Sequence, residues 1–204
     1  MKIVLASGNI HKKKEFAEIF HGHTLLLPAD LGLDFYHEET GTTFLENAMG
    51  KARTLRRMMQ ETGKDLLPVI ADDSGICLPA LGMAPGVYSA RYGDLAAGGN
   101  LTDAERNQFL LDKMKDKEDR AAFFVCAMVL IIEEYRFFAA QETLCGQLAR
   151  RPSGCGGFGY DPLLYLPEQG RTVAELEQPE KNRISHRAKA ALALKILMEK
   201  REIP

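Results

Sequence analysis

Two adjacent carboxylates, Asp72 and Asp73, come directly after an apolar run and are followed by Ser74 and Gly75. The run, residues 67–71, has the composition of a buried strand, so the sequence predicts that both carboxylates leave the end of that strand. Ligands of open α/β sheets bind beyond the carboxyl ends of the strands. Two carboxylates there could hold Mg²⁺ through oxygen and position a water molecule. The alternative interpretation is a turn in which an aspartate bonds nearby backbone N–H groups.

A second carboxylate pair, Glu38 and Glu39, lies just before a predicted helix. Thr43 and Glu46 form a T-x-x-E capping box, which marks the start of this helix. Mg²⁺ demands octahedral coordination that it shares with substrate phosphates and water, so a second source of protein oxygen would suit a magnesium site. Alternatively, these acidic residues only stabilise the helix start through its dipole.

The turn after the first predicted strand, residues 2–6, is small and polar and has the sequence Ser7-Gly8-Asn9-Ile10-His11-Lys12. A helix is expected from about Ile10 to Phe20. The N–H groups and the dipole at a helix start favour an anion, and a glycine lets a phosphate approach the backbone. The sequence therefore predicts a phosphate site, although the P-loop pattern is absent. Solvated lysines in an ordinary turn are the alternative.

Cations near helix N-termini support the phosphate interpretation. Lysines occupy positions 12–14 at one predicted helix start, and His186 and Arg187 occupy another. Such cations are unfavourable by roughly 0.3–1 kcal/mol each, and a bound polyphosphate would reverse that sign.

A glycine-dense loop, residues 153–162, carries Phe158, Gly159, Tyr160 and Asp161. Its glycines would let the loop approach a ligand closely, and its aromatic rings could stack on a nucleobase. The alternative is that an aromatic ring anchors the loop on the core.

Three hydrogen-bond donors, Lys181, His186 and Arg187, follow within seven residues. Together they could contact an acceptor-rich ligand. By itself, His186 would be interpreted as a capping or surface histidine.

The elements that must position these residues indicate an α/β fold with a mixed central β-sheet flanked by helices. Helical spacing predicts buried Phe16, Ile19 and Phe20 in the first helix, and a second helix whose Leu45, Ala48, Ala52, Leu55 and Met59 share one face. Thr102 and Glu105 cap a further helix, and a last one should start near Ser185 and bury Ala188, Leu192 and Ile196. Further strands are expected at residues 122–132, 136–140, 143–150 and 163–166.

Composition limits the class of protein. The chain of 204 residues suits a single domain over 1–204, and its net charge of −2 argues against a protein that coats nucleic acid. The longest apolar run, residues 121–132, is shorter than the roughly 20 residues of a membrane helix, and we expect neither a signal peptide nor a membrane partner. Four widely spaced cysteines suggest reduced thiols in a cytoplasmic protein.

Six motifs in order along nearly the whole chain closely resemble the inosine/xanthosine triphosphate pyrophosphatase family. They are Ser7-x-Asn9-x-x-Lys12; Glu39-Thr40-Gly41 with Phe44-x-Glu46-Asn47-Ala48 and Lys51-Ala52-Arg53; Ala71-Asp72-Asp73-Ser74-Gly75; Pro85-Gly86-x-Tyr88-Ser89-Ala90-Arg91; Gly157-Phe158-Gly159-Tyr160-Asp161-Pro162; and Ile184-Ser185-His186-Arg187. Each motif is weak singly, but their shared order makes a chance match improbable. Cys155 departs from the small hydroxyl or glycine usual in this loop.

The resemblance implies two lobes with the active-site cleft between them, a homodimer, and Mg²⁺-dependent hydrolysis of ITP, dITP and XTP to the monophosphate and pyrophosphate. It also implies roles for individual residues. Asp73 matches the catalytic acidic residue that helps to hold the metal, and either Glu38 or Glu39 matches the other metal-linked carboxylate. Triphosphate contacts match the turn from Ser7 to Lys12 together with Lys51 and Ser74; base contacts match Phe158, Gly159, Tyr160, Asp161, Lys181, His186 and Arg187.

Two other functions fit the same residue types. A related enzyme could act on modified pyrimidine nucleotides or on dTTP and UTP, and a regulator could bind a triphosphate without cleaving it. The set of Asp73, Glu39 and Lys51 disfavours the regulator, because a pure binder needs no metal and water at the phosphate chain.

Overall fold

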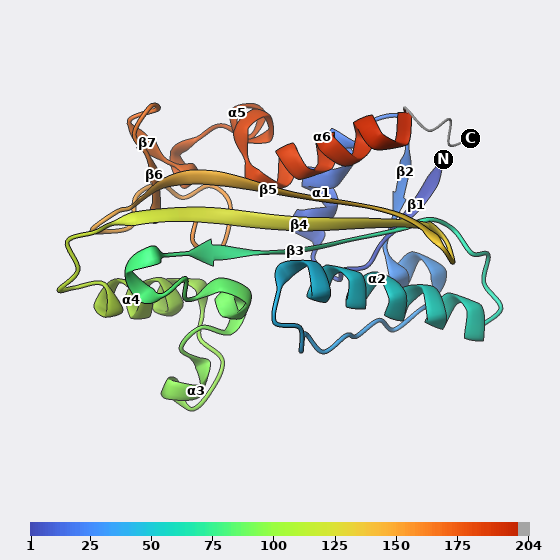
Figure 1. Ribbon diagram of the computed structural model, residues 1–204, viewed down its shortest axis with the longest axis horizontal. Helices are drawn as coiled ribbons and strands as arrows, with labels where there is room; N and C mark the ends of the chain where they lie inside the picture. Colours follow the sequence, from blue (N-terminus) through green and yellow to red (C-terminus); the bar gives the residue numbers. More distant parts are fainter. Residues whose placement is uncertain (200–204) are drawn as a thin grey trace. The chain divides into compact units, whose positions relative to one another are not determined.

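The computed structural model describes residues 1–199, apart from the side chains of His11 and Glu199. Within this range seven strands form one sheet in the order β2-β1-β3-β4-β5-β6-β7 (Figure 1). They are β1 (Lys2–Leu5), β2 (Thr24–Leu26), β3 (Val69–Cys77), β4 (Ala121–Glu133), β5 (Arg136–Leu148), β6 (Leu164–Leu166) and β7 (Arg171–Thr172). Strand β1 is parallel to β2 and β3, whereas β6 is antiparallel to β5 and β7. The predicted α/β fold with a mixed sheet is thus confirmed.

The described helices are α1 (Ile10–Ile19), α2 (Phe44–Glu61), α3 (Asp94–Ala97), α4 (Asp103–Lys113), α5 (Gln178–Ile184) and α6 (His186–Glu199), with short 3₁₀ turns at Pro28–Leu31, Pro79–Leu81, Gly86–Arg91 and Val173–Glu175. Two of the described helices, α2 and α4, begin after a threonine that caps them. The Thr43 side chain accepts from Glu46 N, and Thr102 accepts from Glu105 N. Both predicted capping boxes are confirmed, because these hydrogen bonds satisfy N–H groups that a helix start leaves unpaired.

The chain divides into two compact units. Unit 1 consists of Met1–Asp73, Cys126–Glu142 and the described part of His186–Pro204, and unit 2 consists of Ser74–Val125 and Thr143–Ser185. The single domain over 1–204 and the cleft between lobes stay predictions.

The core of unit 1 lies on both faces of its sheet strands. Along β1 and the residue that follows it, Ile3 and Leu5 pack with α1 and α6, whereas Val4 and Ala6 pack with α2. This division follows the alternation of side chains along a strand. Figure 1 accordingly shows α1 and α6 on one side of these strands and α2 on the other. Strands buried on both faces explain why residues 3–6 and 69–71 are continuously apolar.

Unit 2 has its own core, in which Leu110 of α4 and Met114, the residue after this helix, are buried. These two side chains contact a cluster of buried residues from the ends of β3, β4 and β5 and from the segment that follows β5. The cluster includes Ile76, Leu78, Phe124, Leu148, Tyr160, Leu163, Leu164 and Val173. The glycine loop is thereby anchored through Tyr160, in agreement with the alternative that an aromatic ring holds the loop on the core.

Several predicted boundaries are wrong. Strand β3 continues to Cys77, so Asp72 and Asp73 lie inside it and not beyond its end. The two strands expected at 136–140 and 143–150 are the single strand β5. In α6, Leu192 is 54% exposed and Ile196 is 42% exposed, because Ala191, Leu194 and Met198 form the stripe that packs on the core.

Other details of the elements also differ from the prediction. On α2, Leu45 is exposed although its predicted partners Ala48, Ala52, Leu55 and Met59 are buried. The sequence did not predict β2, β7, α3 or α5. No helix within residues 1–199 combines the length and apolar character needed to cross a membrane.

Candidate active site

The position of Asp72 and Asp73 inside β3 sends their side chains to opposite faces of the sheet. Asp72 contacts Lys12 and Arg187, at the starts of α1 and α6, whereas Asp73 contacts Asn47 and Lys51 on α2. The expectation that both carboxylates leave a strand end is therefore wrong, whereas their role in binding a metal stays a prediction. A strand forces adjacent side chains apart, and each aspartate has its own network.

Asp73 is held by two side chains of α2. Asn47 Nδ2 donates to Asp73 Oδ2 over 2.9 Å, and Lys51 Nζ lies 3.4 Å from Asp73 Oδ1. Lys51 Nζ also donates to Glu39 Oε1 over 2.6 Å, so the lysine joins two carboxylates. Asn47 and Lys51 are four residues apart on α2, which places them on the same side of the helix. The Asn47 side chain also accepts from Gly41 N over 2.8 Å, which ties the segment carrying Glu39 to the same site.

The electrostatics of this network differ between its members. Burial raises the pKa of Asp73, and the Glu39 charge adds to this effect, while Lys51 opposes both; the pKa of Asp73 stays above its ordinary value. Burial lowers the pKa of Lys51, but Asp73, Asp72 and Glu39 together outweigh it and raise the pKa overall. Because its pKa is raised, Lys51 stays charged. Its Nζ lies closer to Glu39 than to Asp73, so its charge compensates that of Asp73 only in part.

The structure distinguishes the two candidate glutamates. Glu39 pairs with Lys51, with its side chain 23% exposed. Glu38 is exposed, and no hydrogen bond or ion pair joins it to any residue that the structure describes. The metal-linked role predicted for one of them stays a prediction, and the contacts favour Glu39.

Asp72 is the centre of a second network. Lys12 Nζ donates to Asp72 Oδ1 over 2.9 Å, and Arg187 Nε lies 3.4 Å from Asp72 Oδ2. Arg187 Nη1 in turn donates to Glu15 Oε2 over 2.6 Å. Burial raises the pKa of Asp72, but the positive charges of Lys12 and Arg187 outweigh it and hold this pKa well below its usual range. Asp72 is therefore ionised, and the positive charges of Lys12 and Arg187 compensate its negative charge.

The turn from Ser7 to Lys12 begins α1 with local hydrogen bonds. Asn9 N donates to Ser7 Oγ over 3.1 Å, and Lys12 N donates to Asn9 Oδ1 over 3.3 Å. A side chain at Gly8 would meet open space, so no side chain that the structure describes covers the backbone there. Two of the three lysines at this helix start have carboxylate partners: Lys12 pairs with Asp72, and Lys13 pairs with Asp30 over 2.9 Å. These pairs offset the unfavourable charge without a bound polyphosphate.

The glycine loop of unit 2 carries a third network, centred on Asp161. The carboxylate oxygen Asp161 Oδ2 accepts from Phe158 N over 3.0 Å and from Lys181 Nζ over 2.9 Å. Lys181 Nζ also lies 5.2 Å from the centroid of the Phe158 ring. A side chain at Gly157, whose φ is +73°, would overlap the Asp161 carboxylate. Glycine is thus required where the loop folds back on Asp161.

Two side chains of helix α4 bind the backbone N–H and C=O groups of Gly159. Gly159 N donates to Asp103 Oδ2 over 2.8 Å, and Asn107 Nδ2 donates to Gly159 O over 3.0 Å. Asp103 and Asn107 are four residues apart and therefore face the loop together. Tyr160 is fixed independently, since its hydroxyl donates to Ser89 O over 2.9 Å. The conformation of the loop beside Phe158 depends on α4.

The half-buried Ser74 opens the part of β3 that belongs to unit 2, next to a close backbone approach. A side chain at Gly75 would overlap Ser89 Oγ and Gly86 O. Ser89 Oγ accepts from Ile76 N over 2.9 Å and donates to Gly86 O over 2.6 Å. Gly75 thus lets the segment around Ser89 pack against the strand.

The base-side cations are buried and already engaged. Lys181 pairs with Asp161, and Arg187 pairs with Asp72 and Glu15. His186 is buried at the start of α6. The contacts of these residues with a nucleobase stay predictions.

Four residues of these networks were missing from the predicted site: Glu15, Asn47, Asp103 and Asn107. Of these, only Asn47 carried a usable signal, because it lies four residues before Lys51 within a recognised motif.

The carboxylates fit one kind of metal site. Within the described part of the chain, no group of three His, Cys, Asp or Glu side chains could hold a metal ion. Glu39 and Asp73 nevertheless converge on Lys51 Nζ. Mg²⁺ is commonly bound by one or two carboxylates together with substrate phosphates and water. The pair therefore fits a magnesium ion shared with a triphosphate, and it does not fit a metal held by protein alone.

Comparison with known proteins gives a consistent result. The model of the Ham1 family matches residues 3–197. A dITP/XTP pyrophosphatase of Treponema denticola is 46% identical over 95% of this chain and 96% of its own, and one of Thermus thermophilus is 48% identical over 95% and 90%. A solved HAM1 protein from Coxiella burnetii is 40% identical and superimposes with a TM-score of 0.85 over 98% of this chain and 99% of its own.

Proposed function

The chain belongs to the Ham1 family, and from this membership and the site geometry we propose that it hydrolyses ITP, dITP and XTP to the monophosphate and pyrophosphate. Its relatives are named dITP/XTP pyrophosphatases, and such an enzyme is a hydrolase acting on a phosphoanhydride bond. The observation that carries the proposal is the network in which Asn47 and Lys51 hold Asp73 beside Glu39. It supplies a buried carboxylate with a raised pKa next to a fixed cation, as hydrolysis of a polyphosphate requires.

In this proposal Asp73 orients the attacking water and accepts its proton. A raised pKa makes a carboxylate a stronger base, which favours proton transfer at neutral pH. Asn47 fixes Asp73 Oδ2, so the carboxylate cannot rotate freely. Lys51 offsets negative charge that develops on the phosphates. The water held by Asp73 then attacks the α-phosphorus, and the protein contributes by positioning the reactants and by electrostatic stabilisation.

Asp73 and Glu39 are the residues that would hold magnesium. Bound there, the ion supplies electrostatic stabilisation of the triphosphate and its leaving group. Glu39 is half-buried and contacts Lys51, whereas Glu38 is exposed, so we assign the second carboxylate to Glu39.

The start of α1 would receive the phosphate chain. The uncovered backbone at Gly8 and the N–H groups of the first turn of α1 suit an anion. Lys12 is held in place by Asp72, which is in turn held by Arg187. Ser74 would contribute its hydroxyl. In this arrangement Lys12, whose position is fixed before the substrate arrives, offsets part of the negative charge of the polyphosphate.

The glycine loop would receive the base. Phe158 offers a ring for stacking, and Lys181 offers a donor to the oxygen at position 6 of hypoxanthine or xanthine. Adenine has an amino donor at that position, so two donors would meet. An unpaired buried group costs about 1–3 kcal/mol, more when it is charged. By the family resemblance, His186 and Arg187 are further candidates for contacts with the base. The homodimer implied by the resemblance and the cytoplasmic location suggested by the cysteines belong to the same proposal.

A substrate panel tests the proposal. Purified protein with Mg²⁺ is given ITP, dITP, XTP, ATP, GTP, dTTP and UTP, and phosphate is measured with and without added inorganic pyrophosphatase. We expect phosphate only when the coupling enzyme is present, with ITP, dITP and XTP far ahead of ATP. Equal rates on ITP and ATP would refute the base-side assignment. Nucleotide binding without pyrophosphate release would identify a regulator, and preference for dTTP or UTP would identify the pyrimidine enzyme.

A further inference from the structure

A hollow of about 300 Å³ lies in unit 2 between α4 and the segment that leads from β5 into the glycine loop. Its lining is strongly cationic, although the chain as a whole carries a net charge of −2. The lining residues are Gln108, Leu111, Asp112, Lys115, Arg120, Arg150, Arg151 and Pro152. None of them belongs to the networks around Asp72, Asp73 or Asp161, so the hollow needs an explanation of its own.

Arg120 is a fixed cation in the wall of this hollow. Its guanidinium donates to three backbone carbonyls, from Nε to Leu148 over 3.0 Å, from Nη1 to Met114 over 2.9 Å, and from Nη2 to Ala149 over 2.8 Å. A guanidinium has five N–H groups, so these bonds leave two for a ligand. The bonds order Arg120 without neutralising it, because every acceptor is an uncharged carbonyl.

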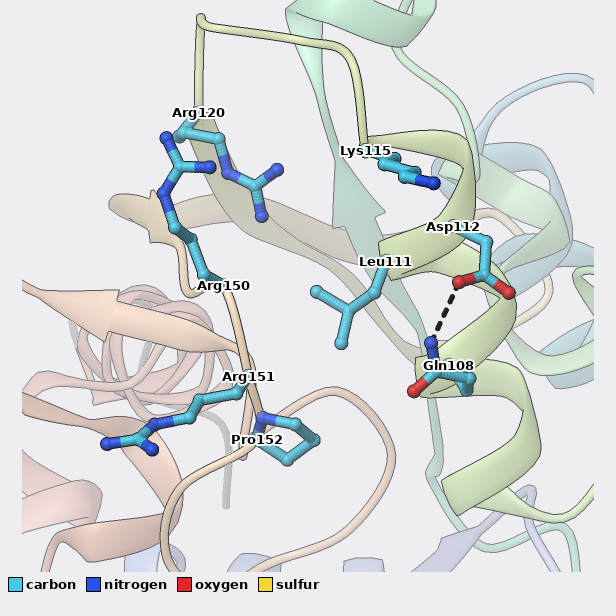
Figure 2. A pocket seen from close by; sticks show the side chains of 8 residues that line it. All are labelled: Gln108, Leu111, Asp112, Lys115, Arg120, Arg150, Arg151 and Pro152. Atoms are coloured by element: carbon cyan, nitrogen blue, oxygen red, sulfur yellow. Dashed lines mark hydrogen bonds between the residues drawn. The ribbon is translucent and has the colours of Figure 1, made fainter.

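Arg150 stands next to Arg120 and repels it. Figure 2 shows the two guanidinium groups close together, with Leu111 projecting from α4 towards the space that they border. Burial and then the charge of Arg150 lower the pKa of Arg120. In the described part of the chain no carboxylate forms an ion pair with Lys115, Arg120 or Arg150. The acidic neighbour Asp112 instead accepts from Gln108 Nε2 over 2.8 Å.

We propose that this hollow binds a small phosphate-bearing anion, with Arg120 as a fixed donor and Arg150 and Lys115 as side chains that close on it. An anion between the two arginines would remove their repulsion and gain charge-assisted hydrogen bonds. The exposed Arg150 and Lys115 can adjust to the ligand, and Leu111 and Pro152 limit its size. The source is either an inorganic anion, phosphate or pyrophosphate, or the phosphate of a nucleoside monophosphate.

The location of this hollow links it to the glycine loop. One wall is α4, whose Asp103 and Asn107 hold Gly159, and the other wall continues directly into the loop at Ser153. A bound anion would therefore join two segments that both fix the glycine loop. Binding itself, however, is independent of the proposed hydrolysis.

Residue-level chemical modification tests the site. Phenylglyoxal is reacted with the full-length protein in the absence of a divalent metal, and modification of each arginine is followed by peptide mass spectrometry. The probes are inorganic phosphate, inorganic pyrophosphate and inosine monophosphate, each compared with sodium chloride at equal ionic strength. We expect at least one probe to slow modification of Arg150 several-fold and to leave the exposed Arg136 unchanged. The probe that protects at the lowest concentration identifies the source of the phosphate.

Matched variants locate the effect. Lys115→Gln should raise the half-protecting concentration roughly two- to fivefold, as expected for one partly exposed charge pair. Lys117→Gln, with the same charge change two residues away and outside the hollow, should not. Lys12→Ala should also keep the protection. Equal slowing of Arg150 and Arg136, equal effects of the two glutamine variants, or loss of protection in Lys12→Ala would each overturn the proposal. The last result would place the anion at the proposed active site.

Discussion

Neutralising two adjacent aspartates should change stability with opposite signs. Asp72 has a lowered pKa, so its charge stabilises the folded state at neutral pH, and this contribution is lost as pH falls below the ordinary value of 3.8. Asp73 has a raised pKa, so its proton is favoured in the folded state, and its ionisation costs stability as pH rises through the folded pKa. Asp72→Asn should therefore destabilise the protein, and Asp73→Asn should not.

The contacts set the magnitude for Asp72→Asn. Breaking a buried ion pair by removing one partner costs about 3–5 kcal/mol. Arg187 retains Glu15, and the Lys12 side chain is 16% exposed and can reach water, so we expect the lower end, about 3 kcal/mol. For a chain of this length, that corresponds to a fall in Tm of roughly 6–12 °C. Asp73→Asn keeps the shape of the side chain and removes a poorly compensated charge, so its Tm should equal or exceed that of the wild type.

Asp73→Asn should affect activity much more than it affects stability. Asp73→Asn should reduce kcat on ITP by roughly 10²–10⁴-fold, the range for loss of a general base. Thermal unfolding followed by circular dichroism at pH 7 gives the stabilities, and coupled pyrophosphate release gives the rates. The reasoning is refuted if Asp73→Asn lowers Tm as much as Asp72→Asn does. An Asp73→Asn protein that keeps more than about a tenth of wild-type activity would remove Asp73 from the catalytic role.

Three further predictions concern separate parts of the molecule. Lys12→Ala should slow hydrolysis of every accepted nucleotide by a similar factor, because Lys12 lies at the phosphate side; a strong change in the ITP to ATP ratio would place it at the base. Asn107→Ala should raise KM for ITP roughly three- to tenfold by releasing Gly159 O, the cost of one hydrogen bond, with little change in kcat, whereas Lys113→Ala on the same helix should match the wild type in steady-state kinetics. Iodoacetamide at pH 8 should alkylate the exposed Cys145 and spare Cys77, because burial raises the pKa of Cys77 to about 11; mass spectrometry that finds equal labelling would contradict this.

Local sequence determined the features that depend on near neighbours. The capping boxes at Thr43 and Thr102 were readable because each is completed within three residues. The apolar runs of β1, the first part of β3 and β4 predicted buried strands and hence the α/β class. The ordered motifs predicted the family, which the comparisons confirmed.

Sequence patterns failed where packing selects between local possibilities. Residues 72–75 are polar or glycine, so their local propensity suggested a turn, yet the ladder of β3 extends through them to Cys77. In α6, Ala188 is buried as predicted, but Leu192 and Ile196, which share its helical spacing, are exposed, and Ala191, Leu194 and Met198 have helical spacing too. Contact with the core formed by α1 and the sheet decided for the second stripe.

Tertiary structure alone decided which charge faces which. Lys12 and Asp72 are 60 residues apart, and Glu15 and Arg187 are 172 apart, so no local pattern reports either pair. Likewise, only the fold places Glu39 rather than Glu38 on Lys51, and only the approach of α4 to the loop gives Asp103 and Asn107 their contacts with Gly159. Residue types fixed which charges were available for the chemistry. Their pairing, and with it the direction of each pKa shift, depended on burial and distance, which exist only once the chain has folded.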